Sequence, residues 1–310
     1  MVVYTDSVHF AEQCLPQAIE AWSAASFPNA DLQRLSNGLF AGRAAHETRV
    51  ETLTSWRYLF LVESAPRSQY DLLIEINQGE TSLDDGILCV AGAGDKFHGF
   101  KNRPWSAAAG NIHLSVHLAP EQRIEHFGVG FIVLAAVSVI DAIDTVPGLE
   151  GRAGIKWVND ILINDAKVCG VLAYTQSVQD TVSTAVLGIG LNVETTPMVE
   201  PTPFVPKVAS LRKVGGDPMS CRQPVLLDRL LQALECNYHL LLEGDVRALL
   251  DQYRQRSVVI GREVDICSDQ AHSEPEVLAR GRVAALGENL ELLIEGVDQP
   301  FSRGRLILKS

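Results

Sequence analysis

Hydrophobic positions in the first 255 residues follow two spacings, one typical of strands and one typical of helices. From Asn111 to Leu118 the apolar residues occupy every second position, which predicts a half-buried strand. Between Leu226 and Leu241 they recur every three or four positions, which predicts a helix. The other predicted strands are 58–62, 87–90, 160–163, 167–174 and 185–193, and the other predicted helices are 10–25, 68–76, 120–144 and 245–254. Strands and hairpins of this kind indicate an α+β fold, with helices packed on a mixed, largely antiparallel sheet.

The pattern changes after Ser257, where only short strands separated by glycine and polar residues remain. This spacing is typical of a small β-barrel or sandwich. We therefore expect two domains, residues 1–255 and residues 256–310. Residues 1–55 cannot be placed by pattern and are treated as an N-terminal extension of the first domain.

Composition and charge exclude several classes of protein. A net charge of -12 disfavours nucleic-acid binding and docking on an anionic membrane, and residues 1–55 show no basic helix-turn-helix, so DNA is not an expected partner. The apolar run 129–140 is shorter than the roughly 20 residues that span a bilayer and predicts a buried helix. The N-terminus lacks a signal peptide, and the six cysteines form no CxxC pair, so we expect buried free thiols in a cytoplasmic protein.

Two glycine clusters and a set of three histidines could suggest ligand sites, but their patterns do not identify a ligand. Gly92-Ala93-Gly94 and Gly188-Ile189-Gly190 match neither the dinucleotide fingerprint nor the Walker A motif. For Gly188 and Gly190, close backbone approach within a sheet is the better interpretation. His98, His113 and His117 could suggest a metal site. No carboxylates accompany them, and alternate histidines are typical of the polar face of a strand, so no side-chain metal site is predicted.

A family resemblance begins in the segment from Lys156 to Leu172, where Asn164-Asp165-Ala166 provides the turn of a hairpin. The segment resembles the K-W-P-N-D and K-x-x-G-I-L signature of biotin protein ligases, within the biotin/lipoate ligase superfamily. The spacing from Asp160 to Lys167 is kept, and Val158 replaces the proline. Further matches, which extend the resemblance over roughly residues 60–310, lie at 187–193, 208–211, 261–264 and 304–308.

This resemblance implies a catalytic fold like that of class II aminoacyl-tRNA synthetases, followed by an SH3-like β-barrel. It implies an ATP-dependent ligase that forms biotinyl-5'-AMP from biotin and ATP, with Mg²⁺, and transfers biotin to a lysine of a biotin carboxyl carrier domain. Two alternatives stay open: a lipoate or octanoate ligase of the same fold, and a non-catalytic protein that binds biotin or an adenylate. A homodimer is also left open.

The resemblance also assigns roles to individual residues. Lys167 and Arg103 are the catalytic cations, and Asn192 reads the adenine edge. The implied biotin site contains Trp105, Lys167, Gly170, Ser68 and Gln69. The implied ATP and adenylate site contains Arg103, Trp105, Lys156, Asn159, Asp160 and Asn192.

The chemistry explains why cations are needed, because a carboxylate must attack an anionic phosphate. Two like charges about 4 Å apart repel by about 4 kcal/mol at an effective dielectric constant of 20, and a fixed lysine and arginine offset this repulsion. The loop 94–105, which would cover the adenylate, departs from the family pattern. It keeps Gly99, Arg103 and Trp105, but His98 and Phe100 stand where the family has arginines.

Overall fold

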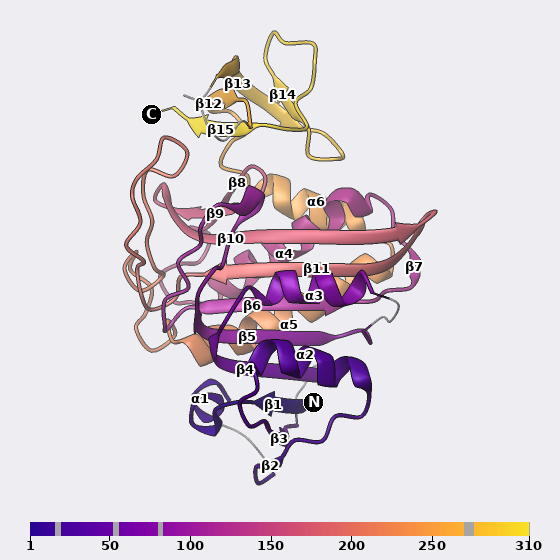
Figure 1. The fold of residues 1–310 in the computed structure, drawn as a ribbon. Coiled ribbons are helices and arrows are strands. Elements are labelled where there is room, and N and C mark those ends of the chain that lie inside the picture. The colour runs from indigo at the N-terminus through magenta and orange to yellow at the C-terminus, as the bar shows by residue number, and fades with distance from the viewer. Residues whose placement is uncertain (16–19, 52–55, 80–82, 270–275, 310) are drawn as a thin grey trace.

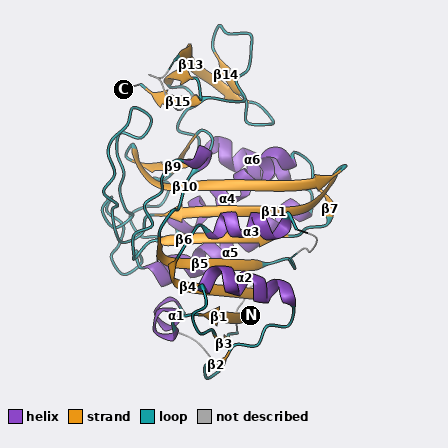
Figure 2. Cartoon of the chain, in the orientation of Figure 1, coloured by secondary structure: helices purple, strands orange, loops and turns teal. Residues whose placement is uncertain are grey.

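The computed structural model, which describes residues 1–15, 20–51, 56–79, 83–269 and 276–309, is built on one large sheet with helices on both faces (Figures 1 and 2). The helices are α1 Val8–Cys14, α2 Ala30–Phe40, α3 Gln69–Asn77, the 3-10 helix η1 Phe100–Asn102, α4 Phe127–Asp144, α5 Gln223–Leu242 and α6 Val246–Gln255. The strands of the large sheet are β1 Val2–Thr5, β2 Ser23–Ala24, β3 His46–Arg49, β4 Tyr58–Ala65, β5 Ile87–Gly94, β6 Ile112–Leu118, β7 Gln122–Arg123, β8 Gly154–Lys156, β9 Asp160–Ile163, β10 Ala166–Val178 and β11 Thr181–Leu191.

The large sheet has the order β2-β3-β1-β4-β5-β6-β11-β10-β9-β8, with β7 paired to β11. Only the β1–β4 and β4–β5 pairs are parallel, and the remaining pairs are antiparallel. The predicted α+β class with a largely antiparallel sheet is therefore confirmed.

Helices cover the two faces of the sheet and create two hydrophobic cores. Helix α4 packs on β10 and β11 with α5 and α6 beside it, whereas α2 and α3 lie on the opposite face (Figure 1). By length and composition α4 is the one helix among the described residues that could cross a membrane, but most of it is buried against the sheet and α5. The predicted buried helix is thus confirmed, although it begins at Phe127 rather than near residue 120.

The N-terminal residues belong to the large sheet. Strand β1 pairs in parallel with β4 through Val2–Thr5 and antiparallel with β3, and α2 packs its leucines against β4. The predicted helix 10–25 is wrong in extent: α1 ends at Cys14, residues 23–24 form β2, and residues 16–19 lie outside the described residues. Because β1 is short and its partner lies about 55 positions further along the chain, local periodicity did not reveal this pairing.

The predicted hairpin and the predicted half-buried strand have different outcomes in the structure. The hairpin is confirmed: β9 and β10 are joined by Asn164 and Asp165, whose φ angles of 53° and 59° suit the short polar side chains of a tight turn. The half-buried strand is wrong, because every residue of β6 is buried. Its apolar side faces the α4 core. On the other side α3 covers His117 and the loop 97–108 covers His113, which leaves these side chains 0% and 2% exposed.

The last residues form a separate antiparallel sheet at one end of the molecule (Figure 1). Its strands, in the order β14-β13-β12-β15, are β12 Glu263–Cys267, β13 Val277–Leu286, β14 Leu292–Ile294 and β15 Arg305–Leu308. The indole of Trp157 donates to the carbonyl of Leu290, and Arg262 forms a 3.1 Å ion pair with Asp165 of the hairpin turn. The C-terminal sheet is therefore anchored beside the β9–β10 hairpin.

Candidate active site

A cavity of about 480 Å³ opens on the face of the large sheet opposite α4. Along β11, Leu187, Ile189 and Leu191 point into the α4 core, which leaves Gly188 and Gly190 on the cavity side. The wall is completed by the first turn of α3, the loop 97–106, the start of the β9–β10 hairpin, the loop 197–208 and one residue of the C-terminal sheet.

Glycines on the strands of the floor make room for large side chains. A Cβ atom at Gly190 would collide with the indole of Trp105, and one at Gly188 would lie 3.1 Å from the ring of Tyr70. A Cβ at Gly170 would lie 3.1 Å from Lys167 Nζ and 3.6 Å from the Trp105 ring. Gly188 and Gly190 are thus positions of close approach within a sheet, as predicted, and the approaching groups belong to the cavity wall.

Trp105 is held by a neutral histidine. Its Nε1 donates to His113 Nδ1 at 3.3 Å, and His113 Nε2 lies 3.1 Å from the carbonyl of Ala108. An imidazole that accepts at one nitrogen and donates at the other carries one proton. Burial lowers the pKa of His113 to about 4, which agrees with the neutral form. His113 therefore positions the indole, and among the described residues no group of three or more His, Cys, Asp or Glu could hold a metal ion.

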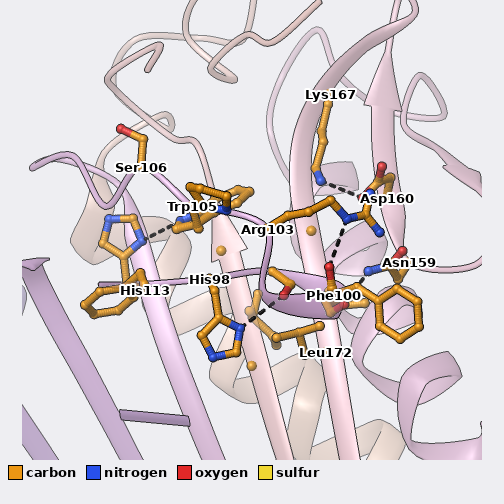
Figure 3. A pocket seen from close by; sticks show the side chains of 18 of the residues that line it. His98, Phe100, Arg103, Trp105, Ser106, His113, Asn159, Asp160, Lys167 and Leu172 are labelled. Atoms are coloured by element: carbon orange, nitrogen blue, oxygen red, sulfur yellow. Dashed lines mark hydrogen bonds and ion pairs between the residues drawn. The ribbon is translucent and has the colours of Figure 1, made fainter. Parts of the chain in front are cut away.

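Charged side chains gather on the side of the cavity formed by the hairpin (Figure 3). Lys167 Nζ lies 2.6 Å from Asp160 Oδ1 and 5.6 Å from the centroid of the Trp105 ring. Arg103 donates from Nε to the carbonyl of Phe100 at 2.9 Å. Asn159 donates to the carbonyl of Val171, which joins the start of β9 to β10. This side of the cavity thus presents two cations, Lys167 and Arg103, beside the carboxylate of Asp160.

Lys156 is the predicted site residue that lies elsewhere. It lines a neighbouring cavity of about 210 Å³, and its Nζ donates to the carbonyl of Phe204. Burial lowers its pKa to about 8, with Asp160 opposing this shift and Lys167 adding to it. Asp160 and Lys167 line both cavities, so Lys156 lies next to the main cavity, where it holds the loop around Phe204.

Two buried amide side chains on the cavity wall have an atom without a partner. Asn192 is fully buried and donates to the carbonyl of Ala209, but its Oδ1 accepts no hydrogen bond from any described residue. Gln69 is 1% exposed, and its Nε2 makes no hydrogen bond. Buried polar atoms without partners are rare in native proteins, and a ligand is one way to satisfy them. The site therefore offers one acceptor and one donor.

The altered covering loop is tied to α3 by an ion pair. His98 Nε2 lies 2.8 Å from Asp71 Oδ2, and His98 Nδ1 lies 3.1 Å from the carbonyl of Gly99. Burial acts to lower the pKa of His98, but the bonds to Gly99 and Asp71 outweigh it and the pKa is raised. Both ring nitrogens already face acceptors, so His98 anchors the loop and has no N–H group left for a ligand.

Nine of the ten residues proposed from the sequence line the main cavity: Ser68, Gln69, Arg103, Trp105, Asn159, Asp160, Lys167, Gly170 and Asn192. Ser68 also caps α3, since its Oγ accepts from the Asp71 N–H. Sequence reasoning missed Tyr70 and Arg305, which line the same cavity. Tyr70 adjoins the predicted pair Ser68-Gln69 and could have been included, whereas no local signal in the sequence marks Arg305.

Comparisons with known proteins agree with this geometry. The Biotin/lipoate A/B protein ligase family profile matches residues 68–192. A biotin--[acetyl-CoA-carboxylase] ligase from Mycobacterium tuberculosis is 30% identical over 232 residues, which cover 72% of this chain and 80% of that protein. The bifunctional ligase/repressor BirA of Bacillus subtilis is 33% identical over 134 residues, 43% of this chain, and the match spans only 40% of BirA.

A solved structure shares the fold. Biotin protein ligase from Aquifex aeolicus, in complex with biotin and ATP, superposes with a TM-score of 0.59 at 20% identity and covers 82% of this chain and 99% of that one. At 20% identity the structural similarity shows the shared fold only. The sequence relatives show membership of the family. The chain belongs to the biotin protein ligase family, within the wider biotin/lipoate A/B protein ligases.

Proposed function

We propose that this protein is an ATP-dependent biotin–protein ligase. In the first step a carboxylate oxygen of biotin bonds to the α-phosphorus of ATP, and the bond from that phosphorus to the bridging oxygen breaks. Biotinyl-5'-AMP forms and pyrophosphate leaves. In the second step the ε-amine of a lysine on a biotin carboxyl carrier domain attacks the acyl carbon, AMP leaves and one proton is released.

The observation that carries this proposal is the grouping of Lys167, Arg103 and Asp160 beside an indole-walled cavity. Lys167 is fixed by Asp160 and by the Trp105 ring, so its charge is in place before the anions meet. Preorganised charge of this kind stabilises a transition state without further reorganisation. Arg103 keeps its terminal nitrogens available for phosphate, since only its Nε is used by the carbonyl of Phe100.

The two buried amide atoms without a partner among the described residues, Asn192 Oδ1 and Gln69 Nε2, suggest how the two ends of the adenylate are recognised. The exocyclic amine of adenine is a donor and would pair with Asn192 Oδ1. The urea carbonyl of biotin is an acceptor and would pair with Gln69 Nε2. A dithiolane or alkyl chain has no acceptor at that end, so Gln69 favours biotin over lipoate or octanoate, because an unsatisfied buried donor costs about 1–3 kcal/mol.

The main cavity also offers carboxylate ligands for the Mg²⁺ ion that binds together with ATP. Asp160 and Glu200 are carboxylates on the wall of the main cavity, and Mg²⁺ is commonly bound through one or two carboxylates together with substrate phosphates. The bound ion would neutralise charge on the departing pyrophosphate. We place the reaction in the cytoplasm, with a carrier domain as the protein substrate.

Acid-dependent pyrophosphate exchange tests the proposal. The purified protein is incubated with Mg-ATP, labelled pyrophosphate and biotin, lipoate or octanoate in turn. We expect label to enter ATP with biotin and little to enter with the other two acids. Exchange with lipoate or octanoate alone would identify a different acid, and measurable biotin binding without exchange would identify a non-catalytic binder.

A further inference from the structure

Within the part of the chain that the structure describes, Arg305 is the one residue of the C-terminal sheet that reaches the main cavity. It is the first residue of β15, where it pairs with Cys267 of β12. Its guanidinium carbon lies 3.3 Å from the centroid of the Phe204 ring, which belongs to the loop 197–208 on the cavity wall. Two segments about 100 positions apart in the chain therefore meet here.

The contacts of Arg305 leave its hydrogen-bonding edge unused. Stacking on a ring occupies the flat face of a guanidinium, whereas its five N–H groups point outward in the plane. Among the described residues Arg305 has this ring as its only direct partner, and its buried Nε has no acceptor. A preoriented guanidinium edge of this kind suits the oxygens of a phosphate group.

The charges around Arg305 point to an anion. Burial lowers the pKa of its guanidinium, and the positive charge of Arg103 lowers it further, while Asp269 and Asp160 oppose this. Both carboxylates are already engaged, since Asp269 pairs with Lys101 of the loop 94–105 at 2.5 Å and Asp160 pairs with Lys167. Arg305 and Arg103 are thus two cations at one cavity, and a polyanion would relieve their repulsion.

We propose that Arg305 binds the β- and γ-phosphates of ATP, which leave as pyrophosphate. This inference rests on the proposed function. Lys167 and Arg103 serve the carboxylate and the α-phosphate, and Arg305 holds the leaving group from the C-terminal sheet. It is a specificity residue for the nucleotide and has no part in the second step, because pyrophosphate has already left.

The test compares Arg305→Gln with Arg303→Gln, since Arg303 is exposed, lies two positions away and does not line the cavity. The affinity for pyrophosphate is measured by calorimetry, and the KM values for ATP and biotin are measured by exchange. A lost charged hydrogen bond corresponds to about a 10- to 100-fold change. We expect Arg305→Gln to weaken pyrophosphate binding and raise the KM for ATP by this factor, with the KM for biotin unchanged and the Arg303 variant like the wild type.

Two further measurements separate this role from its alternatives. Transfer from synthetic biotinyl-5'-AMP to a carrier domain should be unaffected in Arg305→Gln, and a parallel loss there would overturn the proposal by placing Arg305 at the carrier. Phe204→Leu, which removes the ring but keeps the arginine, should raise the KM for ATP in the same direction. If the wild-type protein shows no exchange with biotin, the proposed function fails, but the pyrophosphate affinities still decide the phosphate site. Equal affinities in Arg305→Gln and wild type would refute it.

Discussion

Replacing Lys167 with methionine removes the cation on which the proposed first step depends while keeping a long apolar side chain. Lys167 Nζ lies 2.6 Å from Asp160 Oδ1, and the two side chains are 17% and 15% exposed, so solvent screens this pair only partly. In the variant the incoming carboxylate and the α-phosphate lose their compensating charge, and the carboxylate of Asp160 adds to the repulsion.

The magnitude follows from the charges. Two unit charges about 4 Å apart interact by about 4 kcal/mol at an effective dielectric constant of 20. A loss of that size from the transition state lowers the rate about a thousandfold. Stability should change by less, because a partly exposed ion pair contributes on the order of 1 kcal/mol.

Single-turnover formation of the adenylate, followed by chemical quench, measures the rate, and thermal unfolding checks the fold. Lys213→Met is the matched control, since Lys213 is exposed and does not line the cavity. We expect the control to retain the wild-type rate. A loss of less than tenfold in folded Lys167→Met would refute the role assigned to this cation.

Three other changes probe different parts of the site. Gly190→Ala would displace the Trp105 indole, and we expect the rate of adenylate formation to fall at least tenfold, with Gly128→Ala, where an added Cβ meets no neighbour, as the control. Asn192→Leu should raise the KM for ATP about tenfold or more without changing the KM for biotin, and an unchanged KM for ATP would contradict its adenine contact. Lys156→Met concerns stability: because the pKa is lowered to about 8 in the folded state, the folded protein binds fewer protons than the unfolded chain between about pH 8 and pH 10.5. Stability from this residue therefore rises with pH in that window, by up to about 1.4 kcal/mol per pH unit, and urea titrations at pH 7.5 and pH 10 should show that the stability of the wild type relative to the variant increases between the two pH values.

Much of the β9–β10 hairpin could be predicted because its determinants are local. Asn164 and Asp165 adopt the positive φ angles that their short side chains tolerate, and the turn sets the register that brings Lys167 near Asp160. The alternation along β11 likewise places Gly188 and Gly190 on one side of the sheet. The spacing of such residues along the chain is sufficient to group them.

The features that escaped prediction depend on contacts between distant segments. The pattern of β6 indicates one polar face, yet α3 and the loop 97–108 bury that face, and His113 is neutral beside Trp105. Lys156 follows the family signature, but the loop around Phe204 draws its Nζ away from the main cavity. Arg305 enters the cavity only because the C-terminal sheet is anchored beside the hairpin.

The central claim is that this cavity joins biotin to AMP. The most direct measurement is mass spectrometry of the molecule that stays bound after the purified protein is incubated with biotin and Mg-ATP and passed over a desalting column. The structure predicts bound biotinyl-5'-AMP, and its disappearance with biotinylation when a carrier domain is added. Bound biotin with unreacted ATP, and no adenylate at any time point, would contradict the account.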